Sequence, residues 1–176
     1  MKHAILFASI GIAAGLLMTN MYNSIVDVPA WGHSIPDSLN VARQYYSHSN
    51  PGNFYRIFSP IVQLLGLLSI VFFWKQGKKV RLLLLVAFAM YLTAEGMTFM
   101  YFYPRNAILF GSNVADPETL TNAWQQWRSM NWVRSLAIFI GLACSFAALH
   151  FSYTSSPAST KKYKKYTADQ PSLAMA

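Results

Sequence analysis

The run RLLLLVAFAMYLTAEGMTFMYFY, residues 81–103, decides the fold class of this chain. It is long enough to cross a bilayer, because a membrane-spanning helix needs about 20 apolar residues. After Arg81 it holds a single charged residue, Glu95. An ionisable side chain inside a membrane helix is costly and is a functional candidate by default. The first question is therefore what surrounds Glu95.

Three further apolar stretches accompany this one. Hydrophobic residues make up 54% of the 176-residue chain and charged residues 11%, whereas soluble domains carry about 25% charged residues. These features predict an all-α integral membrane protein, folded as an antiparallel four-helix transmembrane bundle. We expect the transmembrane domain to cover residues 1–152, with spans at about 4–25, 54–74, 82–103 and 131–151.

The lysines predict the orientation. The short loop WKQGKKVR (74–81) and the tail motif KKYKK (161–165) are basic, and cytoplasmic segments carry an excess of Lys and Arg. We therefore expect both termini in the cytoplasm of a bacterial inner-membrane protein, with a disordered tail at 153–176. The net charge of +8 follows these flanks, so no nucleic-acid partner is expected. The lipid bilayer is the expected partner, and the oligomeric state stays open.

The segments between the spans carry helix signals. Pro36 can open a helix to about Ser47, Asp116 can cap a helix beginning at Pro117, and that helix can run on into the fourth span. NPGN (50–53) reads as a turn, and GIAAG (11–15) indicates close helix packing. In the first outer helix, an apolar aromatic face is expected from Leu39, Ala42, Tyr45 and Tyr46.

Polar residues gather at the outer ends of all four spans at helical spacing. Buried polar groups need partners, so we expect these faces to turn inward and form a polar pocket, with Glu95 near Arg134 or Arg56. Two interpretations stay open: a ligand or catalytic pocket, or polar groups that only hold the helices together. The candidate catalytic residues are Glu95, Arg134 and Asn131, and the candidate pocket residues are Asn20, Asn23, Asp27, Arg56, Gln63, Thr98, Asn106 and Trp127.

The histidines give weak metal signals. His33 and His48 lie on the first outer segment without a metal-binding spacing. A site built from both with Glu95 is conceivable, but ligand spacing gives it no support. No metal and no cofactor are predicted.

Four motifs resemble a known family. A Gly/Ala-rich first helix reads GIAAGLLMTNMYNSIVDVPA (11–30), and an aromatic start of the second helix reads NFYRIFSPIVQLLGLLS (53–69). The third helix ends in FYPRNAIL (102–109), and the fourth begins with the W-x-x-x-N-x-x-R element WRSMNWVRS (127–135). Over about residues 10–150 the chain resembles small four-span membrane proteins related to the anthrone oxygenases.

This resemblance implies a four-helix bundle and oxygenation of an electron-rich polycyclic phenol without an obvious metal or flavin. By motif position it carries over Asn106, Trp127, Asn131 and Arg134. Glu95 would then serve as the base and Arg134 or Asn131 would stabilise the phenolate. The leading interpretation is an outward-facing pocket for a small aromatic or lipid-like molecule, with cofactor-independent oxygenation as its chemistry. The alternative is a non-catalytic membrane protein for binding, accessory or transport functions.

Overall fold

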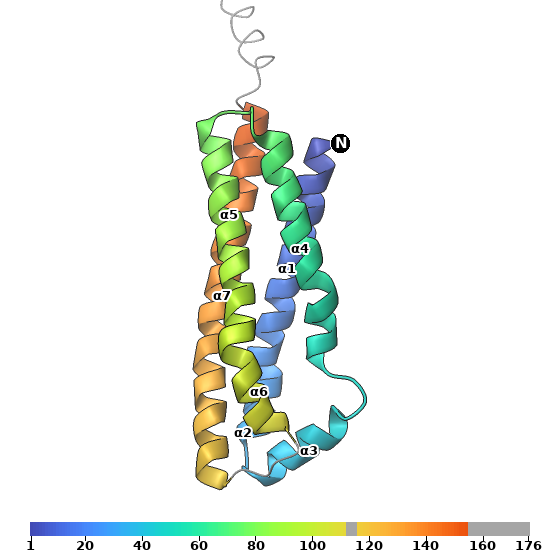
Figure 1. The fold of residues 1–176 in the computed structure, drawn as a ribbon, viewed down its shortest axis with the longest axis vertical. Coiled ribbons are helices and arrows are strands. Elements are labelled where there is room, and N and C mark those ends of the chain that lie inside the picture. The colour runs from blue at the N-terminus through green and yellow to red at the C-terminus, as the bar shows by residue number, and fades with distance from the viewer. Residues whose placement is uncertain (112–115, 155–176) are drawn as a thin grey trace, which may run out of the picture.

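The computed structural model describes residues 1–111 and 116–154, and this part of the chain is almost entirely helical (Figure 1). Four stretches are long and apolar enough to cross a membrane. The protein is therefore an all-α integral membrane protein, as predicted. Most of the expected tail lies outside the described residues. The four stretches are Lys2–Trp31, Pro51–Phe73, Lys78–Phe110 and Pro117–Thr154.

Two of these stretches are built from several helical elements in series. The described elements in chain order are α1 (Lys2–Tyr22), η1 (Asn23–Asp27), α2 (Val28–Gly32), α3 (Asp37–Tyr45), α4 (Pro51–Phe73), α5 (Lys78–Met97), η2 (Thr98–Phe102), α6 (Tyr103–Phe110) and α7 (Pro117–Thr154). The elements η1 and η2 are single π-helical segments, which occur frequently at functional sites.

The first and third spans continue beyond their predicted ends, and prolines explain why the sequence misleads there. Pro29 lies just after η1, and Pro104 lies just after η2. A proline inside an α-helix removes one backbone hydrogen bond and clashes with the carbonyl four residues earlier. The wider π-helical turn before each proline relieves this conflict. The helical path therefore passes through both prolines.

The helix predicted after Pro36 is confirmed, but one residue of its predicted buried face is exposed. The helix after Pro36 forms as α3 and lies across the end of the bundle opposite the N-terminus (Figure 1). Leu39 and Ala42 on its inner face are buried, and Tyr46 is half-buried. Tyr45 is 77% exposed, so its predicted place on the buried face is wrong. Tyr45 lies six residues after Leu39, which places it about 120° from Leu39 around the helix axis and off the narrow buried face of this short helix.

Helix starts follow the capping signals. Asp116 caps α7 as predicted: its Oδ1 accepts a hydrogen bond from the Thr119 backbone N–H at 2.9 Å, and α7 runs unbroken into the membrane. The predicted turn at 50–53 is wrong, because a helix begins at Pro51. Asn50 caps α4 instead, with its Oδ1 accepting from the Gly52 N–H at 2.9 Å, and Pro51 begins the helix.

The predicted packing role of GIAAG is wrong as well. Gly11 and Gly15 are exposed, and a Cβ at either position would meet no atom within 4 Å. The close approach occurs instead at Gly141 on α7, where a Cβ would lie 2.6 Å from the Tyr91 ring on α5. The absence of a side chain at Gly141 lets α5 and α7 run in close contact along the bundle (Figure 1).

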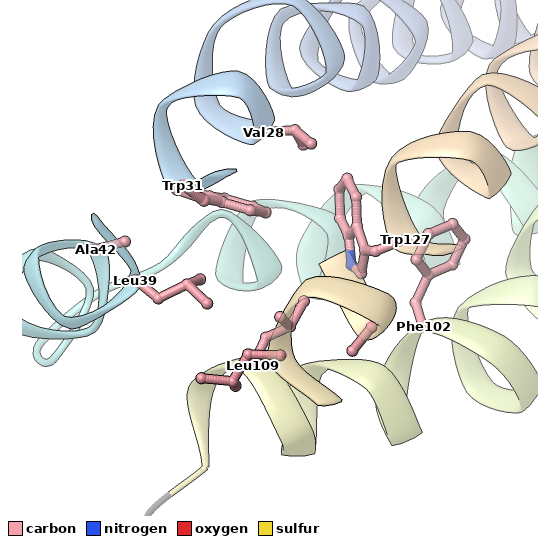
Figure 2. Close-up of a cluster of buried hydrophobic side chains, with 9 residues drawn as sticks. Val28, Trp31, Leu39, Ala42, Phe102, Leu109 and Trp127 are labelled. Atoms are coloured by element: carbon pink, nitrogen blue, oxygen red, sulfur yellow. The ribbon is translucent and has the colours of Figure 1, made fainter. Parts of the chain in front are cut away.

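Apolar clusters fill both ends of the bundle. The end that carries the N-terminus is closed by side chains that include Leu6, Phe73 and Val80. At the opposite end, Trp127 of α7 lies between Trp31 of α2 and Phe102 of η2 (Figure 2), with ring centroids 5.4 and 5.2 Å away. This outer aromatic cluster is one wall of the candidate site.

Candidate functional site

Arg134 is the centre of the polar half of the bundle, opposite the end that carries the N-terminus. Its side chain on α7 is only 6% exposed. One guanidinium nitrogen, Nη2, donates to the amide oxygens of Asn20 and Asn131, each at 2.6 Å, and Nη1 donates to the Thr98 hydroxyl at 3.4 Å. Nε is buried and has no partner among the described residues. The hydrogen-bond partners of the cation are therefore all neutral acceptors, and its Nε atom is left without a partner.

A reciprocal pair of asparagines fixes that arrangement. The Asn20 amide donates to the Asn131 carbonyl at 3.2 Å and to Ser135 Oγ at 2.6 Å, and the Asn131 amide donates to the Asn20 carbonyl at 3.2 Å and to Ser24 Oγ at 2.6 Å. Each asparagine thus reaches the serine four residues after the other. Both amide nitrogens are used across the α1–α7 interface, so both amide oxygens are directed to Arg134.

Aromatic rings surround the guanidinium. Its central carbon lies 4.0 Å from the Phe102 ring centroid, 5.4 Å from that of Tyr55 and 5.8 Å from that of Trp127. These distances fit cation–π attraction, which strengthens when water is excluded. Trp127 is fixed in turn, because its indole N–H donates to Asn106 Oδ1 at 2.9 Å. The tryptophan and asparagine of the resemblance motifs therefore contact each other directly.

A cavity of about 580 Å³ opens beside Arg134. Drug-sized ligands occupy cavities of roughly 300–1,000 Å³ with mostly apolar and aromatic walls. The charged residues in the wall are Arg43, Arg56, Arg134 and Glu95. The aromatic residues in the wall are Trp31, Tyr46, Tyr55, Phe99, Phe102, Tyr103, Phe110 and Trp127.

A smaller chamber lies deeper, towards the middle of the bundle. Its volume is about 30 Å³, and it shares Tyr55, Glu95 and Arg134 with the large cavity. Gln63 lines it, and the Gln63 Oε1 atom is buried without a partner in the described part of the chain. The chamber has room for a molecule about the size of water.

Glu95 lines both cavities from α5 and is half-buried. Within residues 1–111 and 116–154 it makes no hydrogen bond and no ion pair, although its charge acts on Arg134. The expected Glu95–arginine pair is therefore not a direct contact, because Asn20 and Asn131 occupy Arg134 instead. A carboxylate without a structural bond is free to act on a ligand.

The structure brings most of the candidate residues together. Asn23, Arg56, Thr98, Asn106 and Trp127 line the large cavity. Asn20 and Asn131 lie behind Arg134 as fully buried supports and not in the wall. Asp27 is half-buried and is not part of the cavity wall, but its carboxylate lies near enough to act on the Tyr46 and Tyr55 phenols, which line the cavity.

Sequence reasoning missed the aromatic and loop-borne part of the wall. Tyr55 is the clearest case, since its hydroxyl accepts from Asn23 Nδ2 at 3.1 Å and donates to Asn20 Oδ1 at 3.4 Å. Its place four residues before Ser59, on the polar face of α4, was a usable signal. Tyr46 and Arg43 come from α3, and burial together with the nearby Asp27 carboxylate raises the pKa of the Tyr46 phenol. No periodicity signals that α3 folds over the cavity.

The histidines are not part of the cavity wall, although His48 contacts the wall residue Ser47 with its Nδ1 at 2.9 Å from Ser47 Oγ. His33 and His48 are exposed, and His3 at the opposite end contacts Ser152 Oγ at 3.1 Å. Among the described residues, no three His, Cys, Asp or Glu side chains come together as a metal-binding group.

A four-span helical bundle with a buried arginine beside an aromatic cavity defines the class, an integral membrane protein whose cavity has the size of a ligand site. Residues 53–144, more than half of the chain, match the family model described as Anthrone oxygenase. The chain belongs to the anthrone oxygenase family. No curated protein and no solved structure matches it.

Proposed function

We propose that this protein is an oxygenase that converts an electron-rich polycyclic phenol into the corresponding quinone. The observation that carries the proposal is Arg134, a buried cation with neutral partners and one unpartnered N–H group at an aromatic cavity of about 580 Å³. A bound phenolate supplies the charge that its own partners lack. The family supports the same reaction class.

The reaction balances without a separate reductant. In its keto tautomer, such a phenol carries a ring methylene group. This group loses two hydrogens and becomes a carbonyl, while one atom of O₂ enters the product and the other leaves as water. The oxidation of carbon therefore supplies all the electrons that reduce O₂.

Two side chains would divide the proton and charge chemistry. Glu95 takes a proton from the methylene, and the Arg134 guanidinium stabilises the oxygen of the resulting phenolate. The carbanion form adds O₂ and takes the proton back from Glu95 as a hydroperoxide. Glu95 then removes the second methylene proton, the O–O bond breaks, and the released hydroxide takes this proton and leaves as water. The aromatic wall orients the flat substrate and keeps bulk water out.

Two alternatives have less support. Glu95 makes no hydrogen bond or ion pair among the described residues, which speaks against a purely structural role for it. A transport route would need polar groups through the other half of the bundle, where Leu6, Phe73 and Val80 fill the interior. A binding protein without turnover is separated from an oxygenase by the assay below.

The proposal extends to orientation. The lysines of the described part, Lys2, Lys75, Lys78 and Lys79, lie at the end of the bundle opposite the cavity (Figure 1). The positive-inside rule supports a cytoplasmic location for that end. The cavity would then open on the outer side of a bacterial inner membrane.

The test is oxygenation of an anthrone by the purified protein in lipid nanodiscs, with empty nanodiscs as the measure of spontaneous oxidation. We expect quinone formation with one labelled oxygen atom per product under ¹⁸O₂. Glu95→Gln should lower the rate by about 10²- to 10⁴-fold, and Arg134→Gln by about 10²- to 10³-fold. Binding without acceleration over empty nanodiscs would establish the non-catalytic alternative.

Matched control variants distinguish a loss of catalysis from the general effects of removing a charge or of destabilising the fold. Glu118→Gln and Arg128→Gln remove the same charges from exposed positions on α7 outside the cavity wall. Both should keep wild-type rates. Glu95→Gln should also keep the wild-type unfolding temperature, because no hydrogen bond is lost. A Glu95→Gln protein with full activity would rule out Glu95 as the base.

A further inference from the structure

A second arginine in the cavity wall is held in the same way as Arg134. Arg43 on α3 donates from Nε to the Leu109 carbonyl at 2.7 Å and from Nη1 to Asn40 Oδ1 at 3.0 Å. Its Nη2 atom is buried and has no partner within the described residues. Two neutral acceptors thus fix the guanidinium plane and leave one donor nitrogen unused in a residue of the cavity wall.

The shared pattern has an electrostatic consequence. Arg43 and Arg134 each keep a buried N–H group unpartnered, and neither forms an ion pair within residues 1–111 and 116–154. Arg56 also lines the cavity, whereas Glu95 is the one acid in its described wall. The cavity wall is therefore cationic, and the buried charge of Arg134 is costly without an anionic partner. A ligand with two acidic oxygens would compensate both arginines.

The residues that hold the two arginines lie far apart along one helical run. Arg134 contacts Thr98 and Arg43 contacts Leu109, which lie on the continuous run η2–α6. Eleven residues separate these contacts, which corresponds to about 16 Å along a helix. Aromatic rings line the cavity between the two ends, including Tyr46, Phe102 and Phe110. This spacing suits an elongated polycyclic molecule and does not suit a single ring.

We propose that the cavity takes a polycyclic phenol that also carries a carboxylate at its far end. The phenolate oxygen lies at Arg134 and the carboxylate at Arg43, where a planar guanidinium suits a planar carboxylate. The inference rests on the proposed function, because Arg134 marks the reacting end. It assigns Arg43 as the residue that selects acidic substrates.

The test uses two redox-inert product analogues, a dihydroxyanthraquinone and the same quinone with one ring carboxylate. Binding is followed by quenching of tryptophan fluorescence, since Trp31 and Trp127 line the cavity. Hydrogen bonds to charged groups contribute about 1.5–3 kcal/mol, so the wild type should prefer the carboxylated quinone by about 10- to 100-fold. Arg43→Gln should abolish this preference and leave the affinity for the uncharged quinone unchanged.

Two further variants test whether the preference depends on Arg43 itself and on its positive charge. Arg128→Gln removes an equal charge from an exposed position on α7 outside the cavity wall and should keep the preference. Because Arg43 also links α3 to α6, Arg43→Lys is compared as a variant that keeps the charge, and it should retain a reduced preference. Unchanged binding of the uncharged quinone shows that the cavity is intact in each variant.

The outcomes distinguish this inference from the proposed function. Equal affinity of the wild type for both quinones, or a preference that survives Arg43→Gln, overturns the role of Arg43 and leaves the oxygenase proposal standing. Arg134→Gln should weaken binding of both quinones alike. If it weakens neither while the Arg43-dependent preference remains, the assignment of Arg134 is wrong and the carboxylate site stands. Binding of neither quinone to the wild type overturns both.

Discussion

Asn20→Ala should destabilise the bundle far more than one small substitution on a membrane helix usually does. Asn20 is fully buried, and its side chain makes four hydrogen bonds: it accepts from Arg134 at 2.6 Å and from the Tyr55 hydroxyl at 3.4 Å, and it donates to Ser135 Oγ at 2.6 Å and to the Asn131 backbone carbonyl at 3.2 Å. The charged bond is worth about 1.5–3 kcal/mol. Interhelical bonds between neutral groups in membranes average about 0.6 kcal/mol each. One charged and three neutral bonds give an expected loss in unfolding free energy of about 3–5 kcal/mol.

The assay is reversible unfolding in mixed detergent micelles, followed by circular dichroism. Thr19→Ala is the matched control, because the Thr19 hydroxyl donates only to the Gly15 carbonyl within its own helix. We expect that control to change the unfolding free energy by less than about 0.5 kcal/mol. Ser135→Ala removes one neutral partner of Asn20 and should cost about 0.6 kcal/mol. A loss below about 1 kcal/mol for Asn20→Ala would refute the view that this asparagine links α1 to Arg134.

Two other predictions concern the ends of the molecule. The Thr119 hydroxyl and backbone N–H both donate to the Asp116 carboxylate, and these bonds lower the pKa of Asp116 from its ordinary 3.8. The cap is therefore fully formed above pH 3.8. It is lost as the pH falls through the lower pKa that Asp116 has in the folded protein. Hydrogen exchange in the first turn of α7 should therefore accelerate in acid, and Asp116→Asn should remove most of that pH dependence. In intact cells, a cysteine at Ser47 should react with a membrane-impermeant reagent and a cysteine at Lys78 only after lysis; external reaction at Lys78 would reverse the proposed orientation.

The sequence alone determined the features that depend on short stretches: the number of spans, the helix cap at Asp116 and the depth of the polar residues. Span number follows from summed hydrophobicity over about 20 residues, and the cap at Asp116 follows from a residue type beside a proline. The outer concentration of polar residues, with Glu95 and Arg134 among them, was also visible, because each residue's depth along a helix is fixed by counting. These features need no knowledge of neighbouring helices.

Only the tertiary structure decided how the helices are rotated and what they contact. Gly15 and Gly141 are indistinguishable in a local pattern, yet only Gly141 meets another helix. Glu95 was the natural partner for Arg134 by charge, but the reciprocal amides of Asn20 and Asn131 fill that role. The physical reason is that helix rotation is set by the sum of many long-range contacts, which a short stretch of sequence does not encode.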